Sequence, residues 1–130
     1  MPSPEKQTII APEAPKPIGP YSVGVQVGNL VFTAGQAGLD PSTGKLVEGG
    51  IEVETRRTLT NIRIVLKSVG LDMSSVVKTT VYLRDMAEFS KMNAIYAEFF
   101  PENPPARTTI QAAALPFNAA VEIEAVAFLG

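Results

Sequence analysis

The sequence predicts an α+β fold in which a mixed β-sheet carries two α-helices on one of its faces. Stretches with apolar residues at every second position, typical of strands, flank two stretches in which the spacing is three or four residues, typical of helices. The predicted order of elements is β-β-(β)-α-β-α-β-β. Two helices can cover only one face of about six strands. The other face contains small apolar and threonine side chains, so we expect it to be buried against another copy of the chain.

The first elements are an arm and a hairpin. Residues 1–20 hold six of the eleven prolines and are expected to form an irregular arm, with at most a short edge strand at 7–10. Valines at alternate positions of 21–27 predict a strand, and the strand pattern resumes at 30–34. Between them, Gly28-Asn29 suits the positions of positive φ in a two-residue hairpin turn.

Both helices follow the hairpin. Residues 51–69 have apolar side chains at helical spacing, and Gly70 is suited to end this helix in the left-handed conformation. The second helix is expected to begin after Asp85, which resembles the first residue of a capping box, and to end before Pro101. Further strands are expected at 73–83, 106–114 and 121–128, with a short one around Leu46 and a turn at 116–118.

The residue types that the sequence lacks exclude several kinds of chemistry. The 130 residues include no cysteine and no histidine. Disulfides, thiol catalysis, zinc sites of the Cys/His type and serine–histidine–aspartate triads are therefore excluded. Any reaction must use carboxylates, amines, guanidinium groups, hydroxyls or the backbone. A Mg²⁺ or Mn²⁺ ion held by carboxylates is still allowed, but the acidic residues form no cluster that suggests such a site.

Length, charge and hydropathy narrow the class of protein and its partners. A chain of 130 residues fits one domain spanning 1–130. The net charge of −2 and the scattered basic residues argue against tight binding of nucleic acid. No apolar run approaches the roughly 20 residues that cross a bilayer, and the N-terminus lacks the apolar core of a signal peptide. We therefore expect a cytoplasmic protein without a membrane partner.

Two charged residues stand out on the last strands. Arg107 opens the strand expected at 106–114, and such a side chain either faces solvent or offers its guanidinium fork to a carboxylate. Glu122 and Glu124 point to the same side of an otherwise apolar strand. They either form an exposed polar face, or Glu122 lies near Arg107 across a hairpin centred on Pro116.

A polar residue and a glycine interrupt two other apolar patterns. Asn93 lies along the apolar stripe of the second helix, where its amide needs a partner. That partner is either the protein itself or a ligand. Gly35 ends an apolar strand, and a glycine in this position marks a bulge, the close approach of another group, or a simple turn.

Several segments together resemble the RidA (YjgF) family of reactive intermediate deaminases. The similarity spans nearly the whole chain with its spacing intact. The segments that carry it are Ile18–Ser22, Thr33–Gln36, Val77–Asp85, Met92–Phe100, Pro105–Thr109 and Val121–Ala125.

This resemblance implies a chorismate-mutase-like fold and a homotrimer with clefts between subunits. It implies cofactor-independent hydrolysis of 2-aminoacrylate-type enamines and imines to 2-keto acids and ammonia, the reaction of a 2-iminobutanoate/2-iminopropanoate deaminase. Arg107 would bind the substrate carboxylate, and Glu122 would act as acid and then as base. Substrate-binding roles would fall to Tyr21, Gly35, Phe89, Asn93 and Thr109, with Tyr21 and Asn93 allowed to come from a neighbouring subunit.

The sequence departs from the family pattern at two positions. Ala34 stands where some members have serine, and Thr109 where some have cysteine. Because the family roles there are mostly backbone contacts, we expect activity to survive. Two other functions remain open from the sequence: a non-catalytic sensor of 2-keto acids, and an endoribonuclease or translation inhibitor, which the acidic balance and the lack of histidine disfavour.

Overall fold

The computed structural model describes residues 5–130, and residues 1–4 of the expected arm lie outside the described residues. It contains six strands, two α-helices and three short 3-10 helices. The strands are β1 (Gln7–Ile9), β2 (Gly24–Val27), β3 (Leu30–Thr33), β4 (Val76–Leu83), β5 (Ala106–Gln111) and β6 (Val121–Phe128). The helices are α1 (Ile51–Lys67), α2 (Phe89–Phe99), η1 (Met73–Ser75), η2 (Met86–Glu88) and η3 (Pro116–Asn118).

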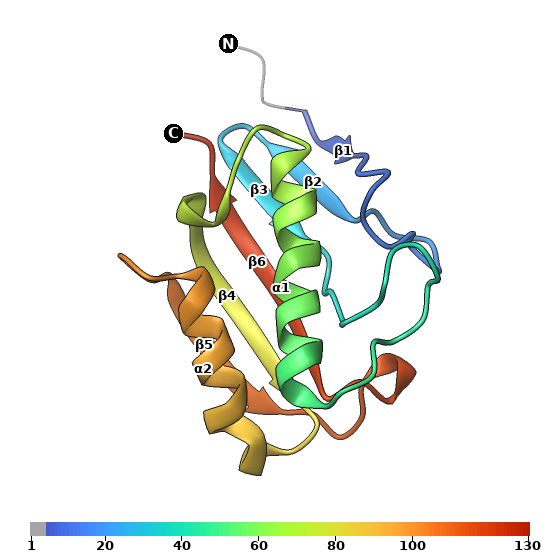
Figure 1. Cartoon of the computed structure of the whole chain (residues 1–130). Helices are drawn as coiled ribbons and strands as arrows, with labels where there is room; N and C mark the ends of the chain where they lie inside the picture. The colour runs from blue at the N-terminus through green and yellow to red at the C-terminus, as the bar shows by residue number, and fades with distance from the viewer. Residues whose placement is uncertain (1–4) are drawn as a thin grey trace.

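The six strands form one mixed sheet in the order β1-β2-β3-β6-β4-β5. β5 runs parallel to β4, and the other neighbouring strands are antiparallel. Helices α1 and α2 lie beside one another on the same face of the sheet (Figure 1). This arrangement confirms the predicted α+β fold with two helices on one face.

The core lies between the helices and the sheet. Leu59 and Ile62 of α1 are fully buried, as the helical spacing of the apolar residues predicts. They belong to one cluster with Val81 of β4 and Ile123 of β6, which are also fully buried. The side chains at alternate positions of the strands therefore face the helices, while their neighbours face the other way.

Within residues 5–130, neither α1 nor α2 covers the opposite face of the sheet (Figure 1). Leu30 and Phe32 of β3 alternate with buried Val31, so they point away from the helices. They are 40% and 41% exposed, and Phe128, the partner of Leu30 in β6, is 46% exposed. We refer to this surface, with Ile110 of β5, as the open face. It agrees with the uncovered apolar face expected from the sequence.

Four local expectations were wrong in detail. The alternation in the sequence predicts that Val77, Thr79, Val81 and Leu83 share one face. Val77 does not, because the pairing of β4 with β6 shifts between Val76 and Lys78, and Val77 is 48% exposed. In the hairpin turn, Gly28 has positive φ (56°) but Asn29 does not. The strand expected at 106–114 ends at residue 111, and Leu46 forms only an isolated bridge with Leu39.

Candidate active site

Gly35 allows the chain after β3 to pass directly over Glu122. The five residues from Phe32 to Gln36 face only the four from Val126 to Ile123, so the strand after β3 holds one extra residue. A β-carbon on Gly35 would lie 2.9 Å from Oε2 of Glu122. Gly35 therefore lies at a bulge and also allows the close approach of another group, two of the three explanations that the sequence offered.

Glu122 points into a hollow of about 410 Å³ on the side of the open face. The hollow lies between the N-terminal arm, the segment after β3 and the turn η3. Tyr21, expected in the site, also lines it and is 50% exposed. We call Tyr21, Gly35 and Glu122 the acid half. The complete lining is Pro15, Lys16, Pro17, Ile18, Tyr21, Val23, Ala34, Gly35, Gln36, Ala37, Leu39, Pro116, Phe117 and Glu122.

The surroundings of Glu122 favour its protonated form. Burial raises the pKa of Glu122, and the nearby negative charge of Glu124 raises it further. Glu124 in turn accepts a hydrogen bond of 2.5 Å from the hydroxyl of Tyr82, the residue opposite Glu122 on β4. A carboxyl group with a raised pKa keeps its proton to a higher pH, which favours its use as a general acid.

Arg107 lies on the other side of the sheet, against α2. Its guanidinium carbon is 4.7 Å from the ring centre of Tyr96 and 5.4 Å from that of Phe89, distances typical of cation–π contacts. Asn93, half-buried, lies on α2 between these two rings in sequence. The hydroxyl of Thr109 is buried and has no hydrogen-bond partner among residues 5–130. We call Phe89, Asn93, Arg107 and Thr109 the arginine half.

The two halves do not meet within one chain, contrary to the expected hairpin. β4 lies between β5 and β6, with Thr79 opposite Arg107 and Tyr82 opposite Glu122. Because Thr79 and Tyr82 are three residues apart, their side chains point to opposite faces of the sheet. Three residues of rise and two strand spacings separate Arg107 and Glu122 by about 14 Å between α-carbons.

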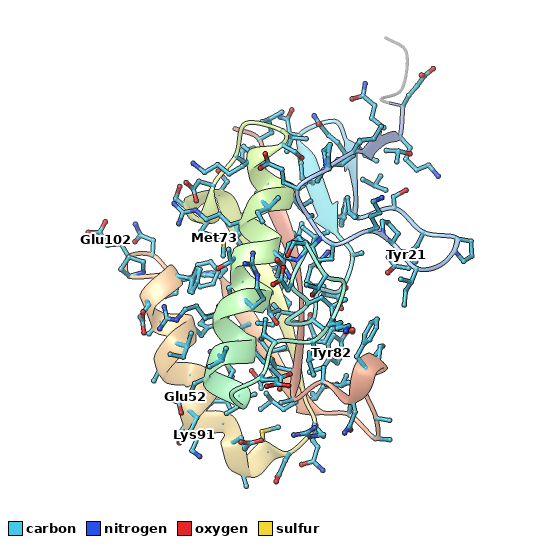
Figure 2. The ribbon with its side chains drawn as sticks, turned by 45° about the vertical axis from the view of Figure 1, so that its right-hand side comes forward. Tyr21, Glu52, Met73, Tyr82, Lys91 and Glu102 are labelled. Atoms are coloured by element: carbon cyan, nitrogen blue, oxygen red, sulfur yellow. The ribbon has the colours of Figure 1, made fainter. Side chains whose placement is uncertain are left out.

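The strand pairing places the acid half on the open face and the arginine half on the face that carries α2. Figure 2 labels Tyr21 of the acid half to the right of α1, and Lys91 of α2 to its lower left. The acid half and the arginine half can therefore form one site only if two copies of the chain contribute to it.

Two buried polar residues of α1 hold the walls of the hollow, and the sequence analysis missed both. Asn61 donates from Nδ2 to the carbonyl oxygens of Ala37 (3.2 Å) and Leu39 (2.9 Å). Glu54 accepts a 2.8 Å hydrogen bond from the N–H of Ala120, just after η3. The signal available in the sequence was a polar residue on the buried side of an amphipathic helix.

A larger hollow of about 540 Å³ lies where α1 and α2 end. Four of the charged side chains that line it form pairs, Arg56 with Glu98 and Arg63 with Asp72. Such surface pairs are common and carry no chemistry of their own. Within residues 5–130, no group of three or more acidic side chains is placed to hold a metal ion, and no helix is long and apolar enough to cross a membrane.

A model of the endoribonuclease L-PSP family matches residues 11–129. The chain belongs to this family. The 2-iminobutanoate/2-iminopropanoate deaminase of Mus musculus is 47% identical over 125 residues, which cover 96% of this chain and 93% of that protein. The chain's membership therefore confirms the resemblance to the RidA (YjgF) proteins.

Solved structures of L-PSP family members have the same fold. The YjgF protein of E. coli matches with a TM-score of 0.89 and 38% identity, covering 94% of this chain and 98% of its own. E. coli TdcF with bound serine matches with a TM-score of 0.89 and 34% identity, with the same coverage. Other L-PSP family members are named RutC family protein or endoribonuclease, so membership alone does not fix the reaction.

Proposed function

We propose that this protein is a cofactor-independent deaminase that hydrolyses reactive 2-imino acids and their enamine tautomers to 2-keto acids and ammonia. We further propose that it works as a homotrimer whose sites combine the acid half of one subunit with the arginine half of its neighbour. The observation that carries the proposal is the placement of the two halves on opposite faces of one sheet. The exposed apolar open face supports assembly, because a monomer rarely leaves such a surface in water.

The arginine half provides the recognition of a small anion. Arg107 is half-buried against two aromatic rings, which limits the directions in which its fork can point. A carboxylate bound by two parallel hydrogen bonds would be fixed in orientation as well as in position. The family member TdcF is described with bound serine, a small molecule that carries such a carboxylate.

The acid half provides the proton transfers. Protonated Glu122 gives its proton to the methylene carbon of the enamine, which becomes the iminium ion. The resulting carboxylate takes a proton from the water that attacks the iminium carbon, which forms the carbinolamine. Glu122 then gives this proton to the amine nitrogen, and as the C–N bond breaks and ammonia leaves, the hydroxyl proton returns to Glu122 and the 2-keto acid is formed. One water is consumed and one ammonia is formed for each substrate. General acid–base catalysis contributes on the order of 10²–10⁴ in rate, enough for a substrate that already hydrolyses in water.

The charges of the two halves act on Glu122 in opposite directions. Within one chain, burial and Glu124 raise its pKa. A guanidinium from the neighbouring subunit would lower it, but a substrate carboxylate on Arg107 neutralises that positive charge. The general acid would therefore be most fully protonated when substrate is bound, which is when the reaction needs it.

Subunit mixing tests the proposal. Glu122→Gln and Arg107→Ala should each lose nearly all release of ammonia from enzymatically generated 2-aminoacrylate. After the two variants are unfolded and refolded together in equal amounts, about a quarter of the sites should contain both intact residues and regain activity. The control is the same treatment of each variant alone.

Each outcome has a clear meaning. A wild-type protein that does not accelerate ammonia release would refute the deaminase, and saturable binding of 2-oxobutyrate would then favour the sensor. Active wild type with no recovery on mixing would show that one chain supplies both residues. A monomer or dimer by light scattering would refute the trimer.

A further inference from the structure

An aromatic residue in an uncommon backbone conformation lies beside Glu122. Phe117 has φ 62° and ψ 13°, and Asn118 follows with φ 54°. Asparagine tolerates the left-handed region, but a bulky aromatic residue is rarely found there. The side chain does not explain the conformation through core packing, because Phe117 is 45% exposed. Such outliers concentrate at functional sites.

The turn that carries Phe117 is firmly held. Pro116 restricts the backbone at its first position, and the N–H of Asn118 donates to the carbonyl of Leu115 at 3.1 Å. Arg84 donates from Nη1 to the carbonyl of Asn118 at 2.7 Å. These hydrogen bonds, one on each side of Asn118, hold the backbone from which the Phe117 ring projects.

The ring forms part of the wall of the acid-half hollow. Phe117, Ile18, Tyr21 and Pro116 line it together with Glu122, so its wall is largely apolar around one carboxyl group. Glycine would adopt the same backbone conformation without strain but would leave this side of the hollow without a wall.

We propose that Phe117 is a specificity-determining residue that contacts the side chain of the substrate and favours 2-imino acids with a longer alkyl group over those with a methyl group. This inference rests on the proposed function. The substrate carboxylate would lie at the arginine half and the reacting carbons at Glu122. The remaining substituent can extend only further into the acid-half hollow, where Phe117 is an apolar wall.

The test compares two imines generated in place by an L-amino acid oxidase, one from leucine and one from alanine. The measured quantity is kcat/KM for the leucine-derived imine divided by kcat/KM for the alanine-derived imine. In Phe117→Gly this ratio should fall about five- to tenfold, since losing one apolar wall affects a branched alkyl group more than a methyl group. Asn118→Gly is the matched control. It removes the side chain of the other residue of this turn that has a left-handed backbone conformation, but Asn118 does not line the hollow.

Phe117→Gly should melt at a higher temperature than the wild type, since glycine relieves the strain of a left-handed aromatic residue, and this shows that the fold is retained. Asn118→Gly should melt close to the wild type, because asparagine already tolerates that backbone conformation. An unchanged or increased ratio in Phe117→Gly, or an equal fall in Asn118→Gly, would overturn the inference while leaving the deaminase intact. A wild type inactive on both imines would refute the proposed function itself.

Discussion

Adding a single methyl group at Gly35 tests whether its close approach sets the position of the Glu122 carboxyl. In Gly35→Ala the new β-carbon would lie 2.9 Å from Oε2, 3.0 Å from Cδ and 3.3 Å from Cγ of Glu122. Ordinary contacts begin at 3.4 Å, so the carboxyl must retreat by about 0.5 Å. Because a catalytic group displaced by about 1 Å can cost roughly 10²-fold, we expect a loss of about tenfold in kcat/KM.

The assay follows the release of ammonia from 2-aminoacrylate at fixed protein concentration, together with urea denaturation. Glu122 is half-buried and able to move, so Gly35→Ala should change the free energy of unfolding by less than about 1 kcal/mol. Gly44→Ala is the opposite control. Its φ is +72° and its β-carbon would meet nothing within 4 Å, so it should lose about 1 kcal/mol of stability and keep full activity.

Two results would refute this reasoning. If Gly35→Ala kept its activity within about twofold, the contact with Glu122 would not determine the position of the reacting carboxyl. If its activity fell only in proportion to lost stability, as judged against Gly44→Ala, the glycine would serve the fold and not the chemistry.

Two further predictions concern the polar residues of α1. Asn61→Ala should lower the free energy of unfolding by about 2–3 kcal/mol in urea denaturation, because it leaves the carbonyls of Ala37 and Leu39 without their buried donor. A loss below about 0.5 kcal/mol would mean that water replaces the amide. Burial raises the pKa of Glu54 despite its hydrogen bond from Ala120, so its contribution to stability is present at low pH and is lost as the pH rises through the raised pKa. Glu54→Gln should therefore gain stability relative to the wild type as the pH rises above the ordinary glutamate pKa of 4.5, and a difference independent of pH would contradict this.

What the sequence predicts well here is local. The helix at 51–67 and the strand at 121–128 follow from spacing and flanking signals that lie within a few residues. Gly35 is also of this kind, because a glycine at the end of an apolar strand points to a bulge or a close approach. The group that approaches, Glu122, lies 87 residues away in the chain and was not fixed by the local pattern.

The relation between Arg107 and Glu122 is where local reasoning fails. A turn between two strands favours a hairpin, but β4 inserts between them and pairs with both. Strand order depends on long-range pairing, and the parallel pairing of β5 with β4 requires the crossover through α2. Because of that strand order, Arg107 and Glu122 point to opposite faces of the sheet. The sequence could therefore identify both residues without predicting how they are placed.

The anchoring of both walls of the hollow to one helix has a consequence for how this protein can change. From the buried side of α1, Asn61 bonds the segment after β3 and Glu54 bonds the segment after η3. A selection for altered turnover in a random library should therefore recover substitutions within this helix, at places that no ligand reaches. Substitutions in α1 that change the stability of the fold should therefore also change the reaction, because this helix covers the core and also sets the shape of the hollow.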